Sequence, residues 1–253
     1  MKQQLQDTII FLHGFTGSNA DWINIAAVLA PSCNIITPDI VGHGNAISPE
    51  NSDDYRMEIV SKTIIALTDS QFNLIGYSMG GRLALYIATH YPDKVKSLTL
   101  ISASPGLKTQ TEREARRKSD NELADKIEKN GIEWFVDFWE NLPLWDSQSP
   151  ELKAELREKR LKNNPVGLAN SLRGMGTGVM PSLWEKLPDL PMPVKLIVGE
   201  LDTKFVGINQ EMANLIPDVN LTIIPDAGHA AHLEKPDEFK EILLEFLNRH
   251  KTP

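Results

Sequence analysis

A serine between two glycines is the residue of this sequence most suited to nucleophilic or base chemistry. The segment reads Gly76-Tyr77-Ser78-Met79-Gly80, which matches the pattern G-x-S-x-G. An apolar run that predicts a strand precedes it, and apolar residues at helical spacing follow it. In that context the turn is sharp, the serine adopts a strained backbone and the glycines avoid clashes. The flanking elements favour this interpretation over a chance match.

A serine hydroxyl becomes reactive only when a base takes its proton and an acid orients that base. On strand–turn–helix folds of this kind the partners follow in the order Ser, Asp or Glu, His. Asp202 comes shortly after a predicted strand at 194–198, and His229 comes after another at 221–224. Both therefore lie at carboxyl ends of strands, on the same edge as Ser78, and we predict a Ser-Asp-His triad.

Two neighbouring residues are alternatives for these roles. Glu200 is close to Asp202 but lies nearer to the strand end. His232 lies three residues beyond His229 and could be a surface or pocket residue. We favour Asp202 as the acid and His229 as the base.

Backbone amides are expected to complete the site. His13-Gly14-Phe15 follows the first predicted strand, where such folds place one amide of an oxyanion hole. We predict the amides of Phe15 and Met79 as the two donors, with His13 supporting the loop instead of reacting. The single cysteine, Cys33, excludes a disulfide framework and a multi-cysteine zinc site. We expect neither a metal nor a cofactor.

The elements that position these residues alternate between strands and helices. Continuous apolar runs separated by helices predict an α/β fold with a mostly parallel sheet covered on both faces. The predicted strands are 8–12, 34–39, 73–76, 95–101, 194–198 and 221–224, and the predicted helices include 79–91 and 237–249.

One stretch without a clear strand interrupts this alternation. Residues 105–187 form helical segments rich in Glu, Lys and Arg, and they contain four of the five tryptophans. We predict a helical cap there, inserted in a core made of 1–104 and 188–253. Six of the nine arginines lie in this insertion. Arginine suits the bidentate recognition of carboxylates, although salt bridges on a helical surface are the ordinary alternative for each one.

Composition limits the partners. The chain has 253 residues with 26 basic and 34 acidic side chains, a net charge of −8 that argues against nucleic acid. The insertion at 105–180 is neutral, with 13 basic and 13 acidic residues, so the acidity belongs to the core and does not exclude a polycarboxylate. No apolar run reaches the roughly 18 residues of a membrane span, and the polar start shows no signal peptide. We expect a cytoplasmic protein, monomeric or a small homo-oligomer.

Together these motifs resemble the α/β-hydrolase fold over nearly the whole chain. Only seven residues precede the first strand, so the usual amino-terminal hairpin is missing. The resembling haloalkane dehalogenases and epoxide hydrolases have an aspartate nucleophile, and Ser78 argues against them.

The motifs of the insertion indicate one particular family within this fold. Residues 112–120, the tryptophan segment 138–145 and residues 160–164 are similar to the 2-succinyl-6-hydroxy-2,4-cyclohexadiene-1-carboxylate synthases of menaquinone biosynthesis, as are 199–205 and 227–232. Asp39-Ile40-Val41 has valine where proline is frequent. The resemblance implies substrate contacts by Tyr77, Arg116, Trp139 and Arg160, with the adjacent Arg117 as the alternative to Arg116.

The resemblance implies a lyase. It would eliminate pyruvate from an enolpyruvyl cyclohexene carrying several carboxylates, with Ser78 abstracting a proton from carbon. A serine hydrolase of esters, or of carbon–carbon bonds beside a ketone, is the alternative with the same triad. A non-catalytic ligand receptor is a third interpretation, which a complete triad argues against.

Overall fold

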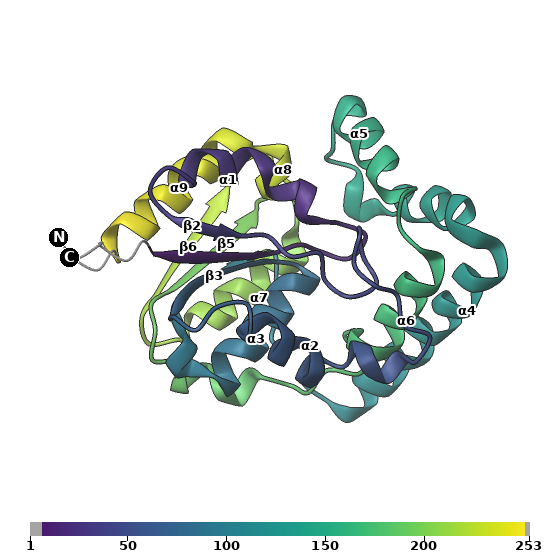
Figure 1. The fold of residues 1–253 in the computed structure, drawn as a ribbon, viewed down its shortest axis with the longest axis horizontal. Helices are drawn as coiled ribbons and strands as arrows, with labels where there is room; N and C mark the ends of the chain where they lie inside the picture. Colours follow the sequence, from purple (N-terminus) through teal and green to yellow (C-terminus); the bar gives the residue numbers. More distant parts are fainter. Residues whose placement is uncertain (1–6, 251–253) are drawn as a thin grey trace.

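The computed structural model describes residues 7–250, and six parallel strands form its centre (Figure 1). The strand order is β2-β1-β3-β4-β5-β6, with every neighbouring pair parallel. The strands are β1 (Thr8–Leu12), β2 (Asn34–Ile36), β3 (Phe72–Tyr77), β4 (Val95–Ile101), β5 (Val194–Gly199) and β6 (Val219–Ile224). This confirms the predicted α/β fold.

The pattern of burial explains which strands the sequence indicates most clearly. Every residue of β1, β3 and β5 is buried, as expected for strands covered on both faces, whereas the edge strands β2 and β6 are largely half-exposed. The prediction that the second strand extends to residue 39 is wrong, because β2 ends at Ile36. Pro38 has no N–H for a ladder, and the Asp39 carboxylate instead accepts the amides of Asn19 and Asn45.

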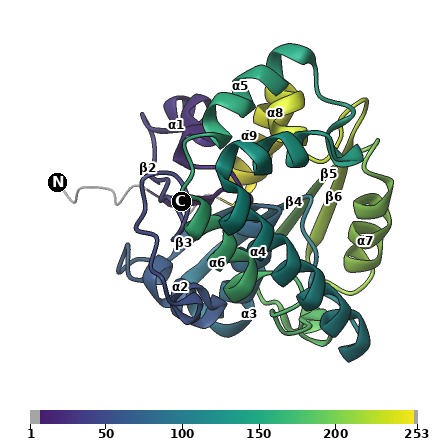
Figure 2. The same cartoon turned by 90° about the vertical axis from the view of Figure 1, so that its right-hand side faces the viewer.

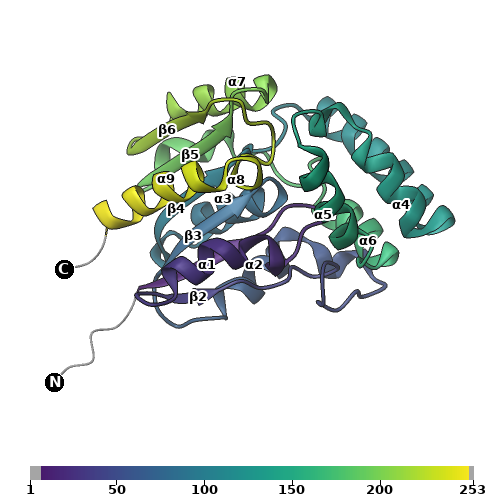
Figure 3. The ribbon, with the colours of Figure 1, turned by 90° about the horizontal axis from the view of Figure 1, so that it is seen from above.

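Helices cover both faces of the sheet (Figures 1 and 3). One face carries α1 (Ile23–Leu29), α8 (Ala231–Glu234) and α9 (Pro236–Arg249). The opposite face carries α2 (Met57–Ile65), α3 (Met79–His90) and α7 (Thr203–Ala213). Short 3-10 turns complete the core: η1 (Asn19–Trp22), η2 (Ser52–Tyr55) and η3 (Pro92–Lys94). A further 3-10 turn, η5 (Trp184–Asp189), leads from the insertion back to the core. No helix within residues 7–250 is long and apolar enough to cross a membrane.

The insertion forms a helical layer beyond one end of the sheet (Figures 1 and 3), and this layer faces the viewer in Figure 2. It consists of α4 (Gln110–Glu140), η4 (Pro143–Trp145), α5 (Pro150–Arg160) and α6 (Pro165–Met175). We propose 105–187 as the extent of this cap and the segments before and after it as the core.

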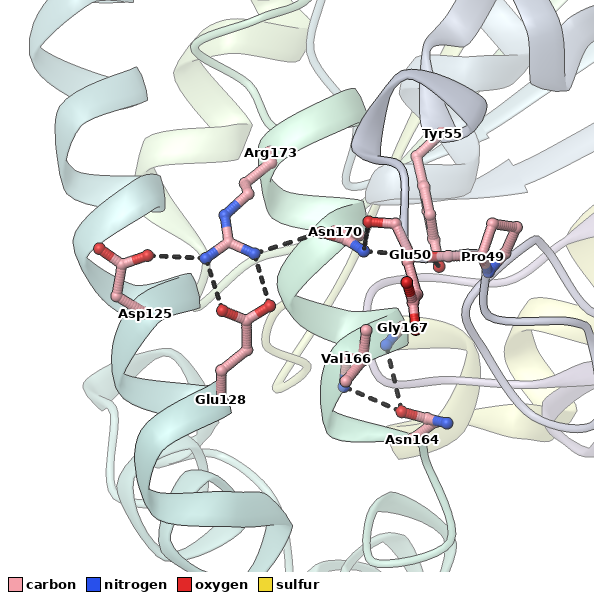
Figure 4. A network of polar contacts seen from close by, with 10 residues as sticks. All are labelled: Pro49, Glu50, Tyr55, Asp125, Glu128, Asn164, Val166, Gly167, Asn170 and Arg173. Atoms are coloured by element: carbon pink, nitrogen blue, oxygen red, sulfur yellow. Dashed lines mark hydrogen bonds and ion pairs between the residues drawn. The ribbon is translucent and has the colours of Figure 1, made fainter.

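Polar contacts hold α6 against α4, the long helix of the cap, and against a loop of the core (Figure 4). Arg173 forms ion pairs with Asp125 and Glu128 of α4 at 2.6 and 2.7 Å. On the other side, the amide of Asn170 donates to the carbonyls of Pro49 and Glu50 at 3.0 and 2.9 Å. Since these contacts join α6 to two separate chain segments, α6 is a fixed wall of the cap.

A glycine interrupts α4 and gives a stability prediction. Gly131 has φ 82° and ψ 180°, a conformation that is essentially restricted to glycine. We expect Gly131→Ala to lower the free energy of unfolding by about 1–3 kcal/mol. Gly207, inside α7 with open space around its Cα, is the matched control, and Gly207→Ala should raise that free energy by about 0.4–1 kcal/mol. Urea unfolding followed by circular dichroism tests both, and a Gly131→Ala protein as stable as the wild type would contradict the strain.

Candidate active site

The backbone at Ser78 is strained as the glycine-framed pattern predicts. Ser78 has φ 49° and ψ −106° at the junction of β3 and α3, a region that residues with side chains rarely occupy. A Cβ on Gly80 would clash with the carbonyl of Leu12, and one on Gly76 would clash with the carbonyl of Gly80. Glycine at both positions therefore allows β1, β3 and α3 to approach closely enough to hold the serine in this turn.

Three side chains from three strand ends form one hydrogen-bonded chain. The Ser78 hydroxyl lies 3.0 Å from Nε2 of His229, and Nδ1 of His229 lies 2.6 Å from Oδ2 of Asp202. His229 and Asp202 are buried, which keeps water from competing for these bonds, while Ser78 is partly exposed. With Nδ1–H donating to the carboxylate, Nε2 is free to accept the serine proton.

The two alternatives weighed from the sequence lie elsewhere. The Glu200 carboxylate accepts the amide of Asp226 at 3.3 Å. His232 is buried, with its ring stacked on Trp22 at a centroid distance of 4.8 Å and 4.3 Å from Tyr77. The geometry thus brings Asp202 and His229 together with Ser78, whereas His232 packs between Trp22 and Tyr77.

The loop after β1 is fixed by a buried histidine. Nε2 of His13 accepts the amide of Ile40 at 2.9 Å, and its Nδ1–H donates to the carbonyl of Gly14 at 2.8 Å. Burial lowers the pKa of His13, which keeps the ring neutral and able to accept from Ile40. His13 thus supports the loop, as the sequence predicts. Phe15 and Met79 both line the cavity beside Ser78.

Core and cap enclose a cavity of about 280 Å³ above the serine. Tyr77, Trp139 and Arg116 all line it, together with Ser78 and His229. Burial raises the pKa of Tyr77 well above its ordinary value, so its hydroxyl remains a hydrogen-bond donor. Arg117, the alternative to Arg116, does not line the cavity. The helical phase of α4 therefore separates the two adjacent arginines.

Two charged residues that the sequence analysis did not predict, Arg82 and Asp120, lie beside Arg116 on one side of the cavity. Nε of Arg116 forms a 2.7 Å ion pair with the buried carboxylate of Asp120. Arg82 of α3 also lines the cavity and donates to the carbonyl of Met175 at 2.8 Å. Burial, with some repulsion from Arg116, lowers the pKa of Arg82 to about 10. In the sequence, Arg82 stands out as a charged residue in the otherwise largely apolar helical stretch 79–90, and this pattern could have indicated its place in the cavity wall.

Arg160 lies in a different place from the other predicted substrate contacts. It is 4% exposed and lines a small chamber of about 30 Å³ next to the main cavity. Its guanidinium carbon lies 5.1 Å from the centre of the Trp145 ring. The main cavity and this chamber share Phe15, Tyr77 and Trp145 as walls.

Two of the other four cap arginines form surface salt bridges, the alternative that the sequence offered for each. Arg157 pairs with Asp137 and Glu140, and Arg173 pairs with Asp125 and Glu128. Of the six arginines of the insertion, Arg116 lines the cavity and Arg160 lines the chamber. Among residues 7–250, no group of three or more His, Cys, Asp or Glu side chains could hold a metal ion.

Fold and site together define an enzyme-like α/β scaffold with a nucleophile turn, and the chain matches the α/β hydrolase fold family over residues 7–236. More specific relatives cover nearly the whole chain. A Bacillus subtilis (strain 168) protein whose name assigns it to the 2-succinyl-6-hydroxy-2,4-cyclohexadiene-1-carboxylate synthases is 44% identical over 95% of this chain and 90% of its own length. The synthase of that name from Photorhabdus laumondii is 30% identical over 95% of this chain and 85% of its own.

A solved structure agrees with these relatives. The structure of MenH from S. aureus superposes with a TM-score of 0.94 at 34% identity, covering 99% of this chain and 97% of that one. The chain belongs to the 2-succinyl-6-hydroxy-2,4-cyclohexadiene-1-carboxylate synthase family.

Proposed function

We propose that the protein eliminates pyruvate from 2-succinyl-5-enolpyruvyl-6-hydroxy-3-cyclohexene-1-carboxylate, in menaquinone biosynthesis. The observation that carries this proposal is the hydrogen-bonded chain Ser78–His229–Asp202 beneath a cap that supplies arginines. Family membership supports the same reaction. The reaction needs a base that removes a proton from carbon and cationic groups that bind the substrate carboxylates. Both kinds of group line the cavity.

The names of substrate and product define the electron flow. The proton leaves ring carbon 2, which is acidified by the adjacent succinyl ketone. Its electrons form the 2,3 double bond, the 3,4 double bond moves to 4,5, and the bond from carbon 5 to the enolpyruvyl oxygen breaks. The departing enolpyruvate takes up a proton on carbon to give pyruvate, so atoms and charge balance.

Ser78 is the proposed base for the first step. His229 takes the Ser78 proton across the 3.0 Å contact, and the serine oxygen abstracts the proton from carbon 2. The imidazolium that results is stabilised by Asp202 at 2.6 Å. The same imidazolium can return the proton when enolpyruvate departs.

Two backbone amides are proposed to stabilise the enolate oxygen of the ketone. The amides of Phe15 and Met79 come from the loop after β1 and from the first turn of α3. Within residues 7–250, no protein hydrogen bond uses the amide of Phe15, and the first residue of a helix has no intrahelical acceptor. Both donors are therefore available for negative charge that develops during proton abstraction.

Pyruvate release tests the proposal directly. The wild-type protein is supplied with the enolpyruvyl cyclohexene and pyruvate is measured by coupled reduction with lactate dehydrogenase, alongside absorbance of the conjugated diene. Stoichiometric appearance of both products is the expected result. Folded protein that releases no pyruvate would overturn the proposal.

A serine hydrolase remains the second candidate, because Ser78, His229 and Asp202 have the geometry that activates a serine for attack on a carbonyl. An activated ester distinguishes the two reactions. A stoichiometric burst of the alcohol product, followed by steady turnover, would favour the hydrolase.

The two adjacent arginines of α4 give a matched pair of variants. Arg116→Lys keeps a positive charge beside Asp120 but loses the planar fork that binds a carboxylate through two parallel bonds. We expect KM for the enolpyruvyl substrate to rise about tenfold. Arg117→Lys, one residue further and outside the cavity, should leave KM within about twofold. Steady-state kinetics measures both, and equal effects would contradict the assignment to Arg116.

A further inference from the structure

The guanidinium of Arg160 is buried without an anion to balance it. Arg160 is 4% exposed, and its Nη1 has no hydrogen-bond partner. The two carboxylates whose charges reach it are already engaged, since Glu140 pairs with Arg157 and Asp21 pairs with Lys159. A buried charge that lacks a partner is costly in free energy, so an arginine in this setting indicates an anion supplied from outside the chain.

A second unpartnered polar group lines the same chamber. Gln148 is 4% exposed, and neither Nε2 nor Oε1 of its amide has a hydrogen-bond partner. Gln148 and Arg160 both line the chamber of about 30 Å³. A buried polar group without a hydrogen-bond partner normally costs free energy. A ligand that binds in the chamber would explain why Arg160 and Gln148 both lack partners there.

The chamber is positioned to receive part of a molecule bound above Ser78. Its walls Phe15, Tyr77 and Trp145 are also walls of the catalytic cavity. Its remaining charged walls are Lys159 and Asp21, which form an ion pair at 3.6 Å, so Arg160 contributes the uncompensated charge. A carboxylate that reached past Tyr77 would meet guanidinium and amide N–H donors together.

We propose that Gln148 is a substrate-positioning residue, which together with Arg160 holds one carboxylate of the substrate in this chamber. The proposal rests on the proposed function, because the polycarboxylate substrate supplies the anion. Gln148 supplies two neutral N–H donors, so it adds directed hydrogen bonds without adding charge. An ordered water shared by Gln148 and Arg160 is the competing explanation, since a space of about 30 Å³ also suits one water molecule.

Binding to an inactivated protein tests the proposal without turnover. In a Ser78→Ala background, calorimetry measures Kd for the enolpyruvyl substrate with Gln148 intact, with Gln148→Met and with Gln148→Glu. We expect Gln148→Met to raise Kd about tenfold. Gln148→Glu should raise it further and raise Tm of the free protein, because the new carboxylate would pair with Arg160. Gln210, exposed on α7, is the control, and Gln210→Met should leave Kd unchanged.

The diene product identifies which carboxylate occupies the chamber. If Gln148→Met weakens product binding as much as substrate binding, the carboxylate is one that the ring retains. If only substrate binding weakens, it is the enolpyruvyl carboxylate, and either result supports the proposal.

Steady-state kinetics of Gln148→Met in the protein with Ser78 intact supplies a second measurement. KM should rise about tenfold while kcat changes by less than about threefold. A wild-type Kd and KM with only a changed Tm would overturn the proposal and favour the bound water. Absence of pyruvate with the wild-type protein would instead overturn the proposed function, and the substrate anion with it.

Discussion

Ser78→Ala is expected to lower kcat for pyruvate release by about 10²- to 10⁴-fold, the range that a positioned base contributes. The variant lacks the hydroxyl that lies 3.0 Å from Nε2 of His229, so the proposed base for the proton on carbon 2 is absent. The substrate would still meet Arg116, Tyr77 and Trp139. We therefore expect its Kd to change by less than about threefold, and calorimetry together with the pyruvate assay measures the two quantities separately.

Another serine of the same cavity is the control for this loss. Ser171 of α6 is buried and lines the cavity, but its Oγ lies 3.6 Å from the sulfur of Met79 and forms no hydrogen bond with the triad. Ser171→Ala should keep kcat within about threefold. If Ser78→Ala retained near-normal turnover, His229 itself would be the base, and the proposed role of Ser78 would be wrong.

The sequence predicts the triad because all strands of a parallel sheet end at the same edge. Residues that directly follow different strands are therefore expected to lie close together. Ser78, Asp202 and His229 each follow an apolar run, and carboxyl ends of parallel strands meet at one edge. The predicted strand at 34–39 is longer than β2, which is an edge strand whose half-exposed residues weaken the apolar signal. The extended stretch up to Asp39 continues past the ladder as a loop whose carboxylate holds two amides.

The cap was less predictable because its residues do not show which way each helix faces. The first half of α4 has few apolar residues, so Arg116 and Arg117 look equivalent in the sequence. The structure distinguishes them through Asp120, which pairs with Arg116 one helical turn away. The unpaired state of Arg160 and Gln148 depends on where distant carboxylates find other partners, and no local pattern contains that information.

The protein is expected to lose stability steeply as pH falls below about 6.5, because buried histidines resist protonation. Burial lowers the pKa of His43 and of His232 to about 3, from an ordinary value near 6.5, and lowers that of His13 in the same direction. Between pH 6.5 and 3 the unfolded chain therefore binds protons that the folded protein does not. Each such histidine lowers the free energy of unfolding by up to about 1.4 kcal/mol per pH unit as pH falls.

From pH 7 to 5.5, His43 and His232 together should remove roughly 2.5 kcal/mol, a large part of a typical total of about 5–15 kcal/mol. His232→Leu tests one of the two, since the ring has no hydrogen-bond partner at either nitrogen and leucine has a similar volume. Urea unfolding at pH 7.5 measures the packing change alone, because the buried ring is neutral there. At pH 5.5 the variant should then lose about 1.3 kcal/mol less than the wild type does. An identical loss in both proteins would mean that His232 accepts a proton in the folded state, and the cost of burying the charged ring would not account for the acid sensitivity.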